Sequence, residues 1–179
     1  MAEFGAKYPC FKPDTADAGV VLGKLVAANL TVNLATGELY ADDALDEQLS
    51  EFASGSLAME TNDLTDENAA VVYGCKVDEK IVTYNVGDTA PAGKLAYFKS
   101  LMRNKVKYYK AILYPCARAA LGNDNTQTKG SSITFATTAT TFSIMADENG
   151  DWHKTQTFGT EEEAKQWINT QCSITVSPG

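Results

Sequence analysis

Apolar and polar residues alternate with a period of two along much of the chain, and this pattern predicts a protein built mainly of β-strands. In residues 30–34, three aliphatic side chains alternate with Thr31 and Asn33, and Gly37 then indicates a turn before a returning strand that begins at Leu39. Because successive strand residues point to opposite faces of a sheet, we expect one face of this pair to be packed and the other to be solvated.

Two further strand pairs are predicted in the second half of the chain. Residues 94–114 are rich in tyrosine and aliphatic residues, and the polar sequence 103–105 (RNK) interrupts them, as expected of a long hairpin. Residues 131–146 combine many threonines and serines with large apolar residues at alternate positions. They predict two more strands, each with one apolar face and one hydroxyl-bearing face.

Two short helices are predicted from the residues at their ends. Thr65 is suited to cap a helix whose first turn is acidic, and Gly74 suits the left-handed position that ends it. Thr160 and Glu163 have the spacing of a capping box at the start of a second helix with one apolar face. The pattern as a whole predicts one β-rich domain with two small helices.

Two segments lack a clear period. Residues 1–17 contain Pro9 and Pro13, so we expect an N-terminal arm without regular structure. Residues 41–55 fit a short amphipathic helix, and an extended acidic loop between two strands fits the same segment equally well. The predicted organisation is an arm at 1–17, a domain at 18–170 with a long loop at 41–55, and a tail at 171–179.

Composition narrows the possible functions. The 179 residues carry a net charge of −8 and the pI is near 4.6, which disfavours nucleic-acid binding because that requires a cationic surface. The four cysteines lie far apart without zinc-ligand spacing, so we expect free thiols. The N-terminus lacks a hydrophobic signal core and no apolar run has the roughly 18 residues of a membrane span, so we expect a cytosolic chain without membrane insertion.

Candidate catalytic and metal-binding residues are few. His153 is the single histidine, so any Ser–His or Cys–His pair would depend on it, and no nucleophile motif lies near it in sequence. Residues 147–151 (DENGD) superficially resemble a calcium loop but lack the alternating oxygen ligands and the final glutamate, so they predict a β-turn. We therefore expect no catalytic residue, no cofactor, no metal and no enzymatic activity.

Charged residues are segregated along the chain. Residues 25–75 contain no lysine or arginine, and residues 94–118 contain no aspartate or glutamate. Such a molecule can associate head to tail with its own copies, but the segregation is equally compatible with solvated faces that mix in the fold. On the first interpretation, contacts between subunits or rings would involve Asp42, Asp43, Asp46, Glu47 and Glu51 on one side and Arg103, Lys105, Lys107 and Lys110 on the other.

The predicted strands strengthen the case for self-association. A strand at the edge of a sheet presents unpaired N–H and C=O groups, which invite pairing with another chain. The hairpin at 94–114 and the strands at 131–146 could join neighbouring subunits into one closed sheet, which removes such edges.

Three long stretches, residues 37–74, 84–119 and 126–168, carry a family resemblance. Their most specific parts are FASGSL at 52–57, the TKG-S-I-F-T pattern at 128–137, and an ending with NG-W, TF and TE-EA. In these features the chain resembles the major tail protein of long-tailed bacteriophages, in the group typified by phage phi13. None of the matching parts is a catalytic motif, so the similarity is one of whole-chain pattern.

The resemblance implies a tail tube protein. Its fold would be a β-sandwich or open barrel with one or two flanking helices, which forms a continuous inner β-barrel when hexameric rings assemble and stack. The acidic segment 41–55 would reach the adjacent ring, and the two termini would reinforce stacking. The protein would reside in the virion tail after assembly in the host cytoplasm, with the genome passing through the lumen without specific binding.

The resemblance also implies protein partners, namely further copies of the chain, a tape measure protein, a tail terminator and distal tail or baseplate proteins.

A different class of function stays open at this point. A β-sandwich module that binds carbohydrate or a host surface would show exposed aromatic residues around a concave face. Tyr108, Tyr109 and Tyr114 are the candidates for such a surface, although their spacing suits strand packing equally well.

Overall fold

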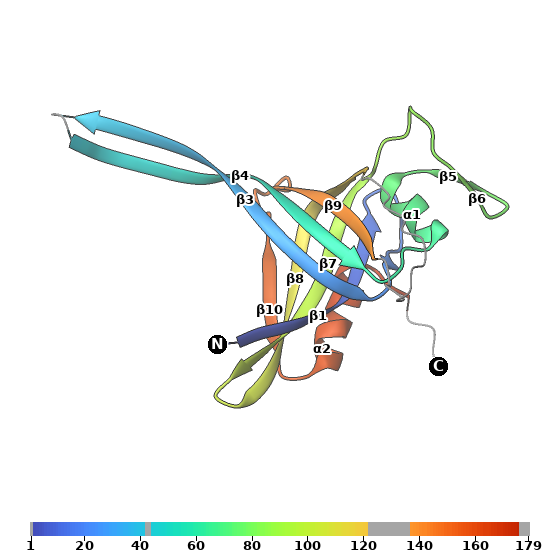
Figure 1. Cartoon of the computed structure of the whole chain (residues 1–179). Helices are drawn as coiled ribbons and strands as arrows, with labels where there is room; N and C mark the ends of the chain where they lie inside the picture. The colour runs from blue at the N-terminus through green and yellow to red at the C-terminus, as the bar shows by residue number, and fades with distance from the viewer. Residues whose placement is uncertain (1, 42–43, 122–136, 176–179) are drawn as a thin grey trace, which may run out of the picture.

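The computed structural model describes residues 2–41, 44–121 and 137–175, which fold mainly into antiparallel β-strands (Figure 1). The strands are β1 (Ala2–Pro13), β2 (Val20–Val21), β3 (Leu25–Ala41), β4 (Ala44–Thr61), β5 (Lys76–Asp78), β6 (Ile81–Thr83), β7 (Ala92–Arg103), β8 (Val106–Ala120), β9 (Thr138–Met145) and β10 (Lys154–Phe158). The helices are α1 (Asp66–Tyr73) and α2 (Glu161–Gln171). The predicted β-rich class is therefore confirmed.

Eight strands form one antiparallel sheet in the order β2-β1-β7-β8-β9-β4-β3, with β10 added beside β8. One edge of β8 pairs with two strands, since the first half of β8 pairs with β10 and the second half pairs with β9. The predicted hairpin around residues 103–105 is confirmed as β7–β8, with Arg103 opposite Val106 at the turn. Strands β5 and β6 form a separate small hairpin.

The large sheet curls, so that strands far apart in its order face each other across a core. Phe11 of β1 and Phe142 of β9 are separated by two strands in the sheet, yet their ring centroids lie 5.7 Å apart. We call this concave side the inner face. Its core also contains Leu57 and Met59 of β4, Leu95 and Tyr97 of β7, Ile112 and Tyr114 of β8, and Val72 of α1.

The outer face of the same sheet carries α2. Ala96 and Phe98 of β7 are buried against a second core that includes Ala164 and Ile168 of the helix. Alternation explains both cores, because neighbouring residues of β7 point to opposite faces of the sheet. A strand that is buried on both faces has a nearly continuous apolar sequence, as residues 95–98 do.

The predicted helix ends and the predicted turn are confirmed. Thr65 caps α1 by accepting a hydrogen bond from the backbone N–H of Asn68, and Gly74 ends it in the left-handed conformation. Thr160 and Glu163 form the capping box of α2. Residues 147–151 form a turn in which the N–H of Gly150 donates to the carbonyl of residue 147 at 3.0 Å.

The prediction of an irregular arm at residues 1–17 is wrong. Ala2–Pro13 is a strand, β1, which pairs with β7 along almost its whole length. Pro9 lies where the pairing register shifts, and Pro13 is the last residue of the strand. Proline is tolerated at bulges and strand ends because the missing N–H is not required there. The two prolines therefore interrupt the pairing without preventing the strand.

The prediction for residues 41–55 is wrong in both of its alternatives for the described residues 41 and 44–55, which belong to strands and form neither a helix nor a loop, while residues 42–43 lie outside the described residues. Ala44–Thr61 is one long strand, β4, paired with β3 from Ala44 onward. The register shifts twice opposite residues 44–54, between Asn33 and Leu34 and between Leu39 and Tyr40, and a third time between Leu25 and Ala27. An extra residue changes which positions share a face of the strand, so Leu45 and Phe52 lie on one face and Leu49 lies on the other, although their spacing would fit one face of a helix.

Two predictions near the end of the chain are resolved in part. Thr138–Met145 is a strand, as predicted, while residues 131–136 lie outside the described residues. In the predicted tail at 171–179, residues 173–175 form no strand or helix, and residues 176–179 lie outside the described residues. Cys172 and Ile174 instead pack against the outer core.

Candidate assembly surface

Strands β3 and β4 extend together well beyond the body of the protein (Figure 1). Of β4, the segment Gly55–Thr61 also pairs with β9, and the rest of the strand pairs with β3 alone among the described residues. We call residues 33–54 the arm. An isolated two-stranded hairpin is marginally stable in water, so we expect a long arm to require a surface beyond its own two strands.

The apolar stripe that β3 contributes to the core continues onto the arm. Ala28 and Leu30 pack against the inner core, and Val32 and Leu34 follow on the same face of the strand. Leu34 is 57% exposed. The arm therefore carries a core-like stripe to a place where no other described strand covers it.

The opposite face of the arm presents two leucines between two glutamates. Leu39 lies directly opposite Glu47, Leu49 lies opposite Gly37 on the same face, and Glu51 follows. Leu39 and Leu49 are 54% and 61% exposed, and a shallow hollow of about 480 Å³ lies between these side chains. Exposed leucines bordered by carboxylates are suited to a partner surface that is partly apolar and positively charged.

The structure describes the side chains of two of the five acidic residues that were predicted to make contacts between subunits. Glu47 and Glu51 are exposed on the arm face just described. Asp42 and Asp43 lie outside the described residues, and the side chain of Asp46 is likewise not described. Within the described chain, Glu47 and Glu51 form no ion pair.

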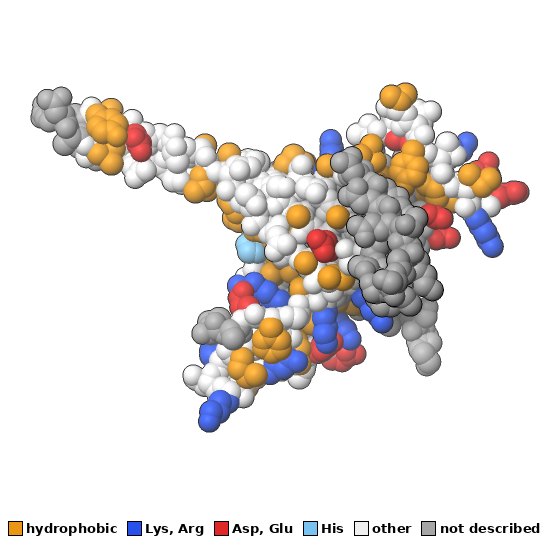
Figure 2. Space-filling model, in the orientation of Figure 1, with side chains coloured by type: hydrophobic (Ala, Val, Ile, Leu, Met, Phe, Trp, Pro, Cys, Tyr) orange, Lys and Arg blue, Asp and Glu red, His pale blue; other side chains and the backbone are white. Residues whose placement is uncertain are grey.

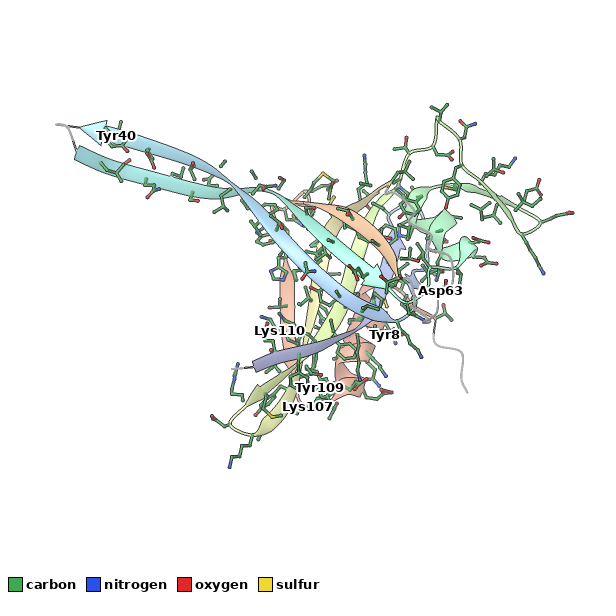
Figure 3. All side chains as sticks on the ribbon, viewed as in Figure 1. Tyr8, Tyr40, Asp63, Lys107, Tyr109 and Lys110 are labelled. Carbon is green, nitrogen blue, oxygen red and sulfur yellow. The ribbon has the colours of Figure 1, made fainter. Side chains whose placement is uncertain are left out.

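The four predicted basic residues lie on the β7–β8 hairpin but not on one face of it, and Figure 3 labels two of them, Lys107 and Lys110. Lys107 belongs to the outer side, where its ammonium lies 5.7 Å from the ring centre of Phe4 and 5.1 Å from that of Tyr109. Lys105 occupies the turn with a φ of +65°. The structure therefore separates these two residues from the other two.

Lys110 and Arg103 lie on the inner side of the hairpin. Lys110 is two residues before Ile112, which belongs to the inner core, so both share a face of β8. Arg103 lies with its guanidinium 6.0 Å from the ring centre of Tyr108, which is on the same face. In the described part of the chain neither cation has a carboxylate partner.

Sequence reasoning missed two residues that join this inner cluster. Lys99 lies directly opposite Lys110 in the β7–β8 pair and forms a 2.5 Å ion pair with Glu3 of β1. His153 stacks on Tyr114, with ring centroids 5.2 Å apart. Burial, together with the nearby Lys110 and Lys99, lowers the pKa of His153. We call Lys99, Arg103, Lys110 and His153 the basic inner face.

The position of Lys99 was predictable from the sequence. A hairpin that turns at residues 104–105 places residue 99 opposite residue 110, as the register shows. His153 was not predictable in this way, because β10 joins β8 from the far end of the chain. Figure 2 shows lysine and arginine side chains gathered below the histidine and along the hairpin at lower left.

Three strands have a free edge for further pairing. Within the described residues β2 pairs with β1 alone, β3 pairs with β4 alone, and β10 pairs with β8 alone. A second exposed apolar group lies at the other side of the molecule, around the β5–β6 hairpin, and consists of Val77, Ile81, Tyr84 and Val86.

The sequence matches no protein-family model, and no curated protein is significantly similar to it. Neither described helix has the length and hydrophobicity that a membrane span requires. No cluster of three or more potential metal ligands occurs in residues 2–41, 44–121 and 137–175.

Proposed function

We propose that this protein is a structural subunit that assembles with its own copies, and specifically the tube protein of a long-tailed bacteriophage tail. In this proposal hexameric rings stack into a hollow tube, and the genome passes through it to the host cell. The observation that carries the proposal is the arm, which projects from the body and exposes apolar residues on both faces.

Burial of the arm would provide a driving force for assembly. Leu34, Leu39 and Leu49 are each more than half exposed in the single copy. Complete burial of one leucine side chain contributes about 1.5–3 kcal/mol, so a contact that covers all three contributes several kilocalories per mole before the cost of association. Monomeric proteins seldom expose such residues on a projecting hairpin, whereas interfaces commonly do.

The free strand edges support the same proposal. Pairing of the β3 edge of one copy with a strand of the next would satisfy its unpaired backbone groups. Repetition of this contact around an axis closes a ring, and a ring leaves no edge open. The proposal also includes two properties that the family resemblance implies. The protein would reside in the virion tail, and its partners would be the tape measure, terminator and distal tail proteins.

The net charge is consistent with a conduit for DNA. A chain with a charge of −8 offers few attachment points to phosphate and repels it at moderate ionic strength. On this proposal the protein has no reaction of its own, and the assembled tube is the functional unit.

The alternative function, a carbohydrate- or host-surface-binding module, has less support. Tyr114 is buried, and Tyr108 and Tyr109 are neighbours in β8 and therefore point to opposite faces. The three tyrosines thus do not form one exposed aromatic surface.

Electron microscopy of the purified protein over a range of concentrations tests the proposal. Rings or tubes with a central channel are the expected result. A variant in which Asn-Gly replaces Gly37–Leu49 keeps Thr36 and Ser50 as the closing pair of a short hairpin and is expected to stay monomeric. A wild-type protein that remains monomeric at high concentration, with and without nucleating tail proteins, would contradict the proposal.

A further inference from the structure

The inner face of the β7–β8 hairpin has an excess of positive charge that one copy does not neutralise. Lys99 and Lys110 lie directly opposite each other on neighbouring strands, an arrangement that destabilises a sheet unless an anion lies nearby. Glu3 pairs with Lys99 and supplies one negative charge. Lys110 and Arg103 have no carboxylate within ion-pairing distance among the described residues.

We propose that the basic inner face binds the arm of a second copy of this chain, with Glu47 and Glu51 of the arm next to Lys110 and Arg103. This inference rests on the proposed self-assembly and names the surface that receives the arm. The contact is heterologous, since a projecting hairpin of one copy meets a different surface of the next copy.

Charge complementarity identifies the arm as the occupant. The arm contains Glu38, Asp42, Asp43, Asp46, Glu47 and Glu51 and no lysine or arginine. Glu47 and Glu51 are exposed on one face, on either side of Leu49. The receiving surface offers cations together with the half-buried ring of Tyr108, so it matches both the carboxylates and the leucines.

The arrangement of the two hairpins requires that the arm comes from another copy. Figure 3 places Tyr40, near the end of the arm, far from Lys107 and Lys110 on the other hairpin. The arm and the β7–β8 hairpin project from the body in different directions (Figure 1). Each copy therefore has one donor and one acceptor, which is the requirement for a ring or a filament.

A nucleic acid is a less suitable occupant of the basic inner face. Glu3 lies within the cluster, and the chain as a whole is strongly acidic. A polyanion would meet few cations and a repulsive field around them.

The test is a reversal of charge on each side of the proposed contact. One variant carries Arg103→Glu and Lys110→Glu, a second carries Glu47→Lys and Glu51→Lys, and a third carries all four changes. The matched control carries Lys24→Glu and Lys76→Glu, two exposed lysines outside the basic inner face that form no ion pair within the described chain. Sedimentation velocity measures self-association, and thermal unfolding verifies that each variant is folded.

The first two variants are expected to associate at least about tenfold more weakly than the wild type, and the four-change variant is expected to recover. The control is expected to associate like the wild type. If Arg103→Glu/Lys110→Glu does not fold, the neutral variant Lys110→Gln replaces it, with a smaller loss of association expected.

Each other outcome has a defined meaning. If the wild type assembles but the first variant behaves like the control, or if the four-change variant fails to recover, the inference is wrong and the proposed function stands. If the wild type does not self-associate, the proposed function fails and the inference fails with it. If a short DNA duplex binds the wild type but not the first variant, and association is unaffected, the basic inner face is an anion site for a different partner.

Discussion

Phe52 of β4 stacks on Trp152, with their ring centroids 4.2 Å apart and their planes 4° from parallel. Phe52 lies at the base of the arm, opposite Leu34, and Trp152 lies two residues before β10. The stacked pair therefore connects the arm to a different part of the sheet. Because the distal arm has no further strand partner in the described chain, this contact supports the base of the arm in addition to the pairing of β4 with β9.

Replacement of Trp152 by alanine is expected to lower the free energy of unfolding by about 2 kcal/mol, since it removes a half-buried ring and the stacking contact of that ring with Phe52. It is also expected to speed amide hydrogen exchange in residues 45–54, because the base of the arm loses its support. Tyr84→Ala serves as the control, because Tyr84 is exposed and forms no aromatic pair within the described residues. Its effect on stability is expected to stay within about 0.5 kcal/mol. Equal effects of the two changes would contradict this role of Trp152.

Substitution of the exposed leucines of the arm is expected to separate assembly from folding. Leu34→Ser/Leu49→Ser should change the free energy of unfolding by less than about 1 kcal/mol, because both side chains are more than half exposed. It should weaken self-association at least about tenfold, because both would be buried in the assembly. The matched control is Ile81→Ser/Val86→Ser, which changes two exposed residues of the other apolar group. Assembly that is insensitive to the first pair would show that the arm is not an interface.

Replacement by alanine is expected to change the stability of the protein differently at two glycines. A methyl group at Gly93 would overlap the carbonyl oxygen of Lys12, because β1 and β7 approach closely there. Gly93→Ala is therefore expected to cost about 2 kcal/mol or more, measured by urea unfolding. At Gly37 a methyl group meets no atom within 4 Å, so Gly37→Ala is expected to be neutral or slightly stabilising. A neutral Gly93→Ala would indicate that β1 does not pair with β7 as described.

Stability is expected to fall at alkaline pH. Burial raises the pKa of the Cys172 thiol to about 11 and also raises the pKa of Cys10. The unfolded chain loses these protons near pH 8.5, whereas the folded chain keeps them, so stability is complete below that pH and decreases as the pH rises toward 11. Each group contributes a slope of up to about 1.4 kcal/mol per pH unit.

Cys172→Ala is expected to reduce this slope, as followed by chemical unfolding at a series of pH values. Cys75→Ala is the control, because this thiol is partly exposed. The two buried thiols are also expected to resist alkylation in the folded protein, while Cys75 and Cys116 react. An unchanged slope in Cys172→Ala would show that its thiol titrates normally.

The sequence by itself determined the features that depend on near neighbours. The caps at Thr65, Gly74 and Thr160 use hydrogen bonds within four residues, and each was predicted correctly. The β7–β8 hairpin was also predictable, because its turn is short and its strands are rich in tyrosine and aliphatic residues. The separation of acidic and basic residues along the chain was equally visible.

Tertiary structure alone decided the remaining features. Residues 2–13 form a strand because they pair with the edge of β7. Pro9 and Pro13, taken locally, indicate a segment without regular structure. The apolar residues of β4 resemble a helix in spacing, and pairing with β3 overrides that signal through two shifts of register. The basic inner face arises because β1, β7, β8 and the segment before β10 meet there. A local pattern does not encode contacts such as Glu3–Lys99 and Tyr114–His153, whose residues lie 96 and 39 positions apart.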